Sequence, residues 1–466
     1  VLKRSADNSI IGYSLRIRQK LVEKLKRHMQ NPEAIVVAST LILGYKADLS
    51  NDVLQAYSKT GTIHVLSVSG AHMAILFVLL SFALSFLDRF RYGKLTKAIL
   101  IILLIWCYAL LTGFSPAVCR AAVMISMVIV GKTYSRHIST LNILAVSAFF
   151  LLLYDPYFIT DVGFQLSYLA VFGLIVLQPI VYNWIDIENK WLDKLWILCS
   201  VSIAAQVITF PLSAFYFHQF PVYFLVSNLF IVIPTAVIMY GGLIYLLLPD
   251  IPFISSALGW ILEKSILLMN KVLTLIEHFP YSGINKIWIT TTEYLLLYVI
   301  IISFFYFLYE RRSWLLKLSI GSGLLLTCFI SFKRSDDLVS NNITFLNLRT
   351  HTGIVFKAGA HAVIVSDLKD TDKTYRYSVQ PYLDSCQISN AHIISPTADI
   401  RLPFLVKSSN LLQFQDKRIL LFDKRLQKII LPGKIKLDIL LISDNPDPDI
   451  NFINKYYEYK LLIIDN

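Results

Sequence analysis

Long apolar runs separated by short polar connections dominate the first 332 residues of the chain. Ten of these runs predict membrane-spanning helices, although several are shorter than the roughly 20 residues that a perpendicular span needs. The pattern therefore indicates a polytopic α-helical membrane protein with about ten transmembrane helices. We expect the spans at 64–87, 97–112, 117–131, 139–154, 163–183, 195–216, 222–247, 254–276, 292–309 and 314–332.

The region before the spans, 1–63, contains a basic segment at 14–30. Its apolar residues recur at largely helical spacing, and lysines and arginines fill most of the other positions. Such a pattern predicts a basic amphipathic helix lying on a surface. The apolar face that we expect consists of Leu15, Ile17, Leu21, Leu25 and Met29.

The last part of the chain, 333–466, changes to short apolar runs separated by turn residues, which predicts a β-rich α/β or α+β domain outside the bilayer. Two helical connections fit, near 371–386 and 449–457. We expect strands at 343–348, 353–358, 361–367, 391–396, 418–423, 428–432, 438–443 and 460–465.

Composition supports this division between a membrane block and a soluble domain. The chain is 56% hydrophobic and 16% charged, with a mean hydropathy of +0.60, whereas soluble proteins carry roughly 25% charged residues. Its five cysteines are widely separated, so neither a disulfide framework nor a metal site is predicted, and no cofactor is expected. The net charge of +12 fits either membrane-flanking residues on anionic lipid or a polyanionic partner.

Loop charge predicts the orientation of the spans. The connections 88–97, 132–138 and 310–317 contain lysine and arginine, so they are expected in the cytoplasm. The connections on the opposite side, such as 155–162, contain neither residue. Ten alternating spans in a bacterial inner membrane would then place both the N-terminal region and the C-terminal domain outside the cytoplasm, even though the N-terminal region is basic.

Polar residues inside apolar runs are the candidates for function, because they are costly in a bilayer. The first run contains His64, Ser69, Gly70 and His72, and the spacing places the two histidines near one helix face. The residues either mediate close helix contacts or form the polar lining of a conduit, and both interpretations remain open. A metal-binding histidine pair is disfavoured, because no carboxylate or thiolate accompanies it.

The next connections carry turn and capping signals. Gly113 and Pro116 predict a tight turn between the second and third spans. Arg120 follows about one turn into the third span, where an arginine either extends to the interface or contacts an anion. Asp161 is predicted to cap the fifth span, and Gln165 lies one turn inside it.

Two later spans add further polar groups. Gln206 lies in the sixth span and Asn228 in the seventh. Pro211 and Pro234 are predicted to interrupt these helices, and discontinuous helices recur at transport sites.

Four of these segments resemble, in order, the signature sequences of the ComEC family of competence proteins. They are GTIHVLSVSGAHMAIL (61–76), TGFSPAVCRAAVM (112–124), DPYFITDVGFQLSYLAVFG (155–173) and FPLSAFYFHQFPVYFLVSNLFIVIP (210–234). The resemblance covers about 30–330 and implies a channel that passes single-stranded DNA through the inner membrane. The path is then expected to include His64, Ser69, Gly70, His72, Arg120, Gln165, Gln206 and Asn228.

The resemblance also implies an external metallo-β-lactamase-like domain after the spans. Residues 343–350 keep the apolar pattern of that domain without its chemistry, and a zinc nuclease needs a tight histidine–aspartate cluster. At the expected place, 441–449, no histidine is present, and His351, His361 and His392 are scattered. We therefore predict a degenerate domain that binds no zinc, in which Asp444, Asp447 and Asp449 form a solvated acidic turn rather than a metal site.

The resemblance further implies that residues 1–30 are the remnant or linker of an external domain. No ATP-binding motif is present, so we expect a separate cytoplasmic motor or strand capture to drive transport. An external DNA receptor is a further expected partner, and the chain is expected to form a homo-oligomer. The chain is predicted not to be an enzyme. Two alternatives stay open at this point: a transporter or flippase for another anionic polymer or solute, and a membrane-anchored phosphodiesterase.

Overall fold

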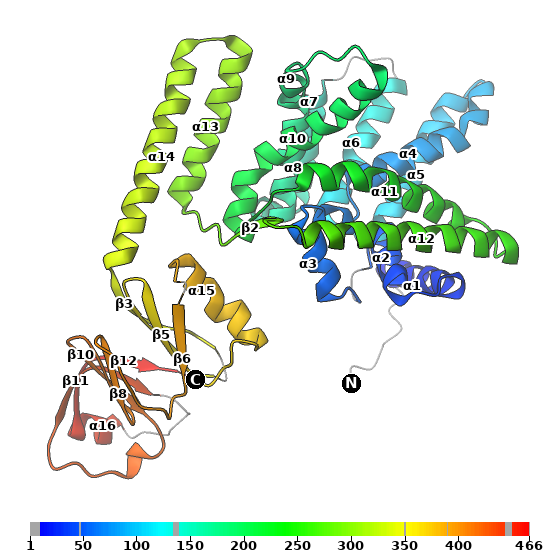
Figure 1. Ribbon diagram of the computed structural model, residues 1–466. Helices are drawn as coiled ribbons and strands as arrows, with labels where there is room; N and C mark the ends of the chain where they lie inside the picture. The colour runs from blue at the N-terminus through cyan, green and yellow to red at the C-terminus, as the bar shows by residue number, and fades with distance from the viewer. Residues whose placement is uncertain are drawn as a thin grey trace. The chain divides into compact units, whose positions relative to one another are not determined.

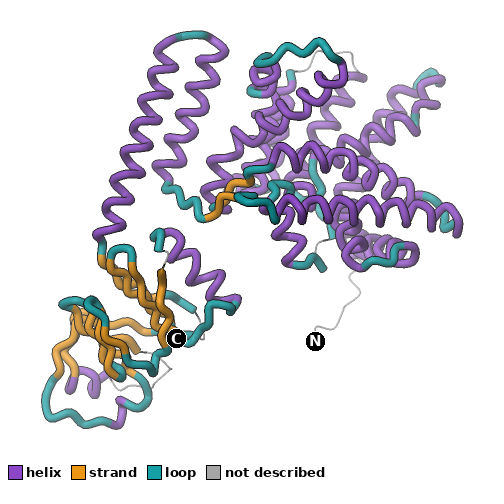
Figure 2. Tube along the Cα trace, in the orientation of Figure 1, coloured by secondary structure: helices purple, strands orange, loops and turns teal. Residues whose placement is uncertain are grey.

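A computed structural model describes residues 10–45, 48–133, 139–348, 351–388, 390–442 and 450–465 of the chain. The chain forms two compact units, residues 1–323 and 324–466. The first is helical and the second contains two β-sheets (Figures 1 and 2).

Fourteen α-helices precede the first strand of the C-terminal unit among the described residues, and the last of them continues into that unit. They are α1 (Ile10–His28), α2 (Pro32–Leu43), α3 (Asn51–Lys59), α4 (Gly70–Ala83), α5 (Gly93–Thr112), α6 (Pro116–Thr133), α7 (Thr140–Tyr154), α8 (Val162–Val176), α9 (Gln178–Tyr182), α10 (Lys190–Phe217), α11 (Phe224–Leu247), α12 (Pro252–Glu277), α13 (Thr291–Glu310) and α14 (Ser313–Val339). Two short strands, β1 (Gln219–Pro221) and β2 (Gly283–Asn285), pair antiparallel and join the two ends of the α11–α12 hairpin.

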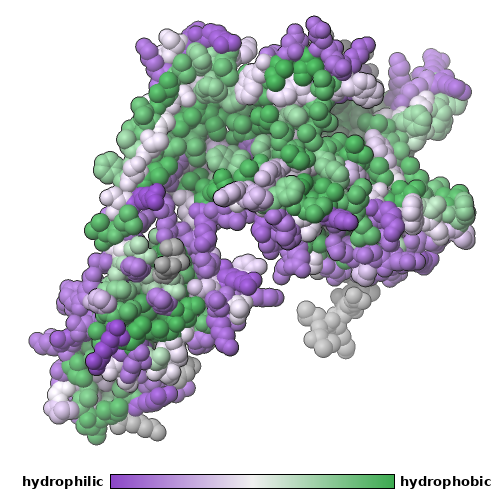
Figure 3. All heavy atoms as spheres, viewed as in Figure 1, coloured by the Kyte–Doolittle hydropathy of each residue, from purple (hydrophilic) through white to green (hydrophobic). Residues whose placement is uncertain are grey.

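Seven of these helices are long and apolar enough to cross a membrane: α5, α6, α10, α11, α12, α13 and α14. Four shorter apolar helices, α2, α4, α7 and α8, accompany them. Each of the ten predicted spans contains an α-helix, so the helical assignment holds, although length alone does not establish how many helices cross. In the space-filling view, apolar residues cover the middle of this unit, and hydrophilic residues gather at its upper turns and lower margin (Figure 3).

Local signals set the helix boundaries. Asp161 accepts the N–H of Phe164 at 2.7 Å and begins α8, as predicted. Gly113 ends α5 with φ +92°, a conformation that costs glycine little, and Pro116 begins α6. The predicted helix interruptions are wrong: α10 and α11 continue through Pro211 and Pro234. A proline removes one helical hydrogen bond, and neighbouring helices in a membrane protein can compensate for that loss.

The N-terminal region packs into the helical unit instead of forming a separate domain. Val22 and Leu25 of α1, and Met29 directly after it, are buried in the same hydrophobic core as residues of α2, α5 and α11. The predicted apolar face was partly wrong, because Leu15 is 46% exposed and Ser14 takes the buried position beside it. The helix therefore packs against protein along one side, where a helix lying freely on a surface had been expected.

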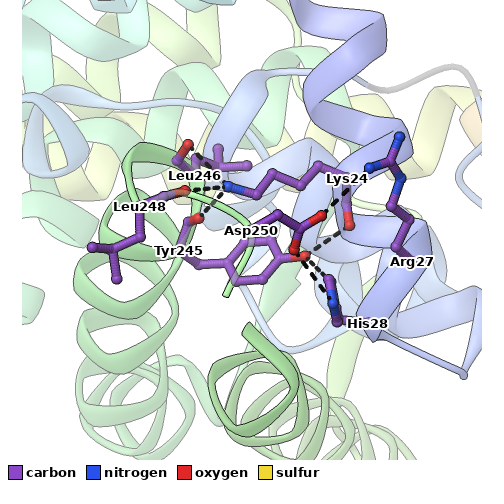
Figure 4. Close-up of polar contacts among 7 residues, drawn as sticks. All are labelled: Lys24, Arg27, His28, Tyr245, Leu246, Leu248 and Asp250. Carbon is purple, nitrogen blue, oxygen red and sulfur yellow. Dashed lines mark hydrogen bonds and ion pairs between the residues drawn. The ribbon is translucent and has the colours of Figure 1, made fainter. Parts of the chain in front are cut away.

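Two basic residues of α1 cap the C-terminal ends of other helices. Arg18 donates from Nε to the carbonyl of Leu111 at the end of α5, at 2.7 Å. Lys24 donates from Nζ to the carbonyls of Tyr245 at 2.9 Å and Leu248 at 2.6 Å, at the end of α11 (Figure 4). The last carbonyls of a helix lack partners within it, so these cations satisfy them and complement the helix dipole.

The C-terminal unit contains two sheets packed face to face. The first has the order β3–β4–β5–β6, and the second has the order β12–β11–β10–β9–β8–β7. Three separate apolar cores lie between α15 and the first sheet, between the sheets, and between the second sheet and α16. The elements are β3 (Asn341–Phe345), β4 (Gly353–Ala358), β5 (His361–Ser366), α15 (Gln380–Ser385), β6 (Asn390–Ile394), β7 (Ile400–Arg401), β8 (Leu405–Ser408), β9 (Leu411–Phe414), β10 (Lys417–Phe422), β11 (Ile435–Ile442), α16 (Ile450–Tyr456) and β12 (Tyr457–Ile464).

Seven of the eight predicted strands are confirmed, and so are both helical connections. The strand expected at 428–432 is wrong, because a short 3-10 turn precedes it and Ile430 is 79% exposed, so the run has no sheet to pack against. The short strands β7, β8 and β9 were not predicted. Each has four residues or fewer, too few for a clear alternating pattern.

Candidate functional site

The N-terminal end of α4 is organised by Ser69 and His72. The backbone N–H of Ser69 donates to Nδ1 of His72 at 3.0 Å, and the Ser69 hydroxyl lies 2.8 Å from the same nitrogen. Because Nδ1 accepts a backbone hydrogen bond, a neutral His72 must carry its proton on Nε2. His72 is 2% exposed, and this Nε2 is buried without a hydrogen-bond partner among the described residues.

The spacing predicts that His64 and His72 share one helix face, and this prediction is wrong. The chain forms a 3-10 turn at Ile63–Leu66, then becomes extended at Ser67 and Ser69, and α4 begins only at Gly70. His64 instead lies 3.2 Å from the carbonyl of Gly61. The extended residues break the helical periodicity on which the prediction depended.

Arg120 of α6 lies at the centre of the candidate site. Its side chain is buried, and it donates to the carbonyl of Ser167 in α8 at 2.5 Å. The guanidinium lies 5.6 Å from the ring centroid of Tyr168, within cation–π range. Arg120 therefore does not extend to the membrane interface, and its Nε is buried without a partner in the part of the chain that the structure describes.

Gly70 brings α4 close to this arginine. A methyl group added at Gly70 would lie 3.4 Å from a terminal nitrogen of Arg120, so the start of α4 and the guanidinium are neighbours. The cluster is completed by the hydroxyl of Tyr168, which lies 3.0 Å from that of Ser147 in α7. Residues from four separate segments of the sequence thus meet at one place, which we call the Arg120 cluster: Ser69, Gly70, His72, Arg120, Ser147, Ser167 and Tyr168.

The Arg120 cluster is suited to an anion. Arg120 is positive, and the N-terminal end of α4 carries the partial positive charge of a helix dipole. Two buried N–H groups, on His72 and Arg120, have no acceptor among the described residues, and leaving such donors unsatisfied is costly. A phosphate oxygen would supply the missing acceptors. Sequence reasoning selected His72 and Arg120, but not Ser147, Ser167 or Tyr168.

The remaining predicted path residues lie on other surfaces. Gln165 donates to the carbonyl of Ile159 at 2.7 Å, a local contact at the start of α8. Gln206 is half-buried on α10. Asn228 is half-buried on α11, and its side-chain oxygen is buried without a partner among the described residues. None of these three belongs to the Arg120 cluster.

Comparison with known proteins identifies the family. The model of the competence protein family matches residues 41–312, more than half of the chain. The chain belongs to this family. The model of the ComEC C-terminal domain matches residues 343–466, which supports membership in the ComEC group of competence proteins.

Two curated relatives of this ComEC family member resemble parts of it. The ComE operon protein 3 of Bacillus subtilis (strain 168) is 30% identical over 201 residues, covering 43% of this chain and 25% of the relative. An uncharacterized protein of Aquifex aeolicus (strain VF5) is 28% identical over 237 residues, covering 51% of this chain and 54% of the relative. The chain thus spans about a quarter and about half of these relatives. No solved structure matches.

The histidines of the ComEC C-terminal domain do not gather into a metal site in the described residues. His351 lies 2.7 Å from a carboxylate oxygen of Asp367, and His361 and His392 are on strands β5 and β6. No group of three potential metal ligands occurs among the described residues. The predicted acidic turn containing Asp444, Asp447 and Asp449 lies outside the described residues.

Proposed function

We propose that this chain functions in DNA uptake during competence, as a channel in the bacterial inner membrane that passes single-stranded DNA. The observation that carries the proposal is the Arg120 cluster, in which a buried cation and unpaired N–H groups have no acidic partner among the residues that the structure describes. The DNA backbone is a chain of phosphate anions, and charge-assisted hydrogen bonds from arginine to phosphate are among the stronger polar contacts. Membership in the competence family supports the choice of DNA over another anionic polymer.

The rest of the path is proposed to be polar and to contact single strands of any nucleotide sequence. Gln206 and Asn228 offer side-chain amides along α10 and α11, and Gln165 adds another amide at the start of α8. His64, on the turn before α4, is proposed to lie near the entrance. Amide and hydroxyl groups can exchange hydrogen bonds with successive nucleotides, as a sequence-tolerant path for single strands requires.

The energy for transport is proposed to come from other components. We infer a separate cytoplasmic motor ATPase and an external DNA receptor as partners, and a homo-oligomer as the assembled state. These proposals rest on the sequence, in which no ATP-binding motif was recognised.

We further propose that the C-terminal unit is a degenerate metallo-β-lactamase-like domain that does not hydrolyse DNA. Its four layers, helix, sheet, sheet and helix, support the fold. The separation of His351, His361 and His392 supports the lack of zinc chemistry. Metal-dependent cleavage of labelled single-stranded DNA by the purified full chain would contradict this proposal.

Substitution of Arg120 tests the channel proposal. Cells lacking the native gene would be complemented with Arg120→Met, which keeps the length of the side chain and removes its charge. We expect uptake of labelled DNA to fall at least about tenfold, since losing one charged hydrogen bond of about 1.5 kcal/mol changes a rate by that factor. The matched control is Arg91→Met, because Arg91 lies in an exposed turn.

The amount of protein in the membrane must be measured for each variant. If Arg120→Met is not retained in the membrane, Arg120→Lys replaces it, because lysine keeps the charge but not the planar, multidentate donors of arginine. Uptake equal to that of Arg91→Met, at equal protein level, would refute a role for Arg120 in transport.

A further inference from the structure

Helix α1 links the ends of two helices that the alternating ten-span arrangement places on opposite sides of the membrane. Arg18 contacts the carbonyl of Leu111 at the end of α5, and Lys24 contacts the carbonyl of Leu248 at the end of α11. Six residues of helix rise only about 9 Å. Even with two extended side chains and their hydrogen bonds added, the two carbonyls are closer together than the ~30 Å thickness of the hydrocarbon layer.

The chain between these two carbonyls contains five longer helices: α6, α7, α8, α10 and α11. If all five crossed the membrane, an odd number of crossings would separate Leu111 from Leu248, and one short helix could not reach both. At least one of the five therefore does not cross.

The α11–α12 hairpin is the segment whose orientation differs from that of helices that cross the membrane. Both helices run across the direction of α10 and α13 in Figure 1, and helices whose projections cross steeply cannot be parallel in space. The turn at the tip of the hairpin, 248–251, contains Asp250 and no lysine or arginine. Cytoplasmic turns are enriched in those two residues, so this tip has the composition of an outer connection.

The side chains of α12 divide into an apolar edge and a polar edge. Positions seven apart share one side of a helix. Ile254, Ile261, Leu268 and Leu275 form one exposed edge, each between 42% and 55% exposed. Positions 256, 263, 270 and 277 form the opposite edge and are Ser, Glu, Asn and Glu.

The polar edge of α12 contacts the N-terminal region. Glu263 accepts the backbone N–H of Gln30 at 2.6 Å, and Glu277 pairs with Lys59 at 3.1 Å. Lys264 and Lys271 are exposed beside the apolar edge, and Lys264 is residue 13 of the 26 in the helix. In an upright α12 this lysine would face the middle of the hydrocarbon layer, which is costly, whereas in a flat helix it reaches the headgroups.

We propose that α11 and α12 do not cross the membrane but lie along its outer face, with the apolar edge of α12 in the lipid of the outer leaflet. Lys264 and Lys271 then contact the phosphate groups of lipid headgroups. The strongly apolar α11 packs against α2, α4, α10 and α12, and its exposed apolar residues, such as Ile233 and Leu247, then face the lipid of the outer leaflet. Eight helices cross in this arrangement: α4, α5, α6, α7, α8, α10, α13 and α14.

This arrangement keeps the basic turns together. The α4–α5 connection and the α13–α14 turn, which both contain lysine or arginine, lie toward the upper edge of Figure 1. Removing two crossings from ten leaves the sidedness of every other connection unchanged. It also allows α1 to contact α5 and α11 on the same, outer side.

Cysteine labelling tests the proposal. In a chain whose five native cysteines are replaced by serine, Phe253→Cys reports on the tip of the hairpin, and Lys264→Cys reports on the middle of α12. Phe253 is 85% exposed. A membrane-impermeant maleimide is applied to spheroplasts before and after permeabilisation. Tyr157→Cys, in an outer connection, and Lys94→Cys, in a basic turn, are the matched controls.

We expect Phe253→Cys and Lys264→Cys to be labelled before permeabilisation, together with Tyr157→Cys, while Lys94→Cys is labelled only afterwards. Labelling of Phe253→Cys only after permeabilisation would overturn the proposal, because the tip would then be cytoplasmic. Protection of either residue in both states would place it inside the hydrocarbon layer and would also overturn it. The measurement uses no DNA, so its failure would leave the channel proposal intact.

Discussion

Lys24 is expected to contribute more to the stability of the helical unit than any other exposed or half-buried lysine of α1. Its ammonium group contacts three carbonyls at the end of α11, those of Tyr245 at 2.9 Å, Leu246 at 3.5 Å and Leu248 at 2.6 Å (Figure 4). Lys24→Met retains most of the aliphatic chain and removes all three contacts. The substitution therefore isolates the polar part of the interaction.

The size of the effect follows from the geometry. Two of the contacts are shorter than 3 Å, and a hydrogen bond to a charged group contributes about 1.5–3 kcal/mol. Lys24 is only half-buried, so water can partly replace the lost donor, and we expect a net loss of about 2–3 kcal/mol. The nearby ion pair of Arg27 with Asp250 is exposed to solvent, so Asp250→Asn should cost less than about 1 kcal/mol.

The assay is thermal unfolding of the purified chain in detergent, with Lys20→Met as the matched control. Lys20 is exposed on the same helix. We expect the unfolding midpoint to fall clearly for Lys24→Met and to stay near that of the native chain for Lys20→Met. Equal midpoints for the two variants would refute the conclusion that α1 is held by capping the end of α11.

Two further substitutions test other parts of the structure by the same assay. Gly173→Ala should lower the unfolding midpoint by an amount equivalent to about 1–3 kcal/mol, because its methyl group would lie 2.5 Å from Cγ2 of Ile208 in α10. Gly323→Ala, where nothing lies within 4 Å, should be neutral or stabilising, and a similar loss at both sites would contradict the close packing of α8 on α10. In the C-terminal unit, the hydrogen bond from Lys460, followed by that from the backbone of Arg418, lowers the pKa of Asp438. The stabilisation is therefore present above the unfolded pKa of about 4 and is lost as pH falls below it. Asp438→Asn should lower the midpoint at pH 7, and the difference from the native chain should shrink near pH 3; a difference that stays constant with pH would show that the ionised carboxylate contributes nothing.

The sequence alone determined most of the secondary structure. Each predicted apolar run contains a helix. In a membrane the backbone N–H and C=O groups of such a run find no water, so they must form hydrogen bonds with one another, as they do in a helix. Caps such as Asp161 and turn residues such as Gly113 act over a few positions, so they were also predicted correctly. The same holds for seven strands of the C-terminal unit, whose short apolar runs pack against the adjoining layers.

The sequence also selected Ser69, His72 and Arg120 as candidates, but it did not predict that Arg120 lies beside the other two. The contact of Arg120 with the carbonyl of Ser167 joins residues 47 positions apart. Every residue has a backbone carbonyl, so the residue type at position 167 does not indicate this contact. The break before α4 put His64 and His72 in different elements, although helical spacing alone predicts that they share one helix face. Tertiary packing, not periodicity, decided the composition of the Arg120 cluster.

Orientation was likewise decided by tertiary contacts. Hydropathy predicts that α11 and α12 are apolar, but an apolar helix can cross a membrane or lie in it beneath other helices. Arg18 and Lys24 restrict that choice, because both reach from one short helix to the ends of α5 and α11. The sequence thus determined which segments are helical and apolar through local hydrogen bonding and the hydrophobic effect. Only the tertiary structure showed which helix ends lie together, because those contacts join residues about 90 and 220 positions apart.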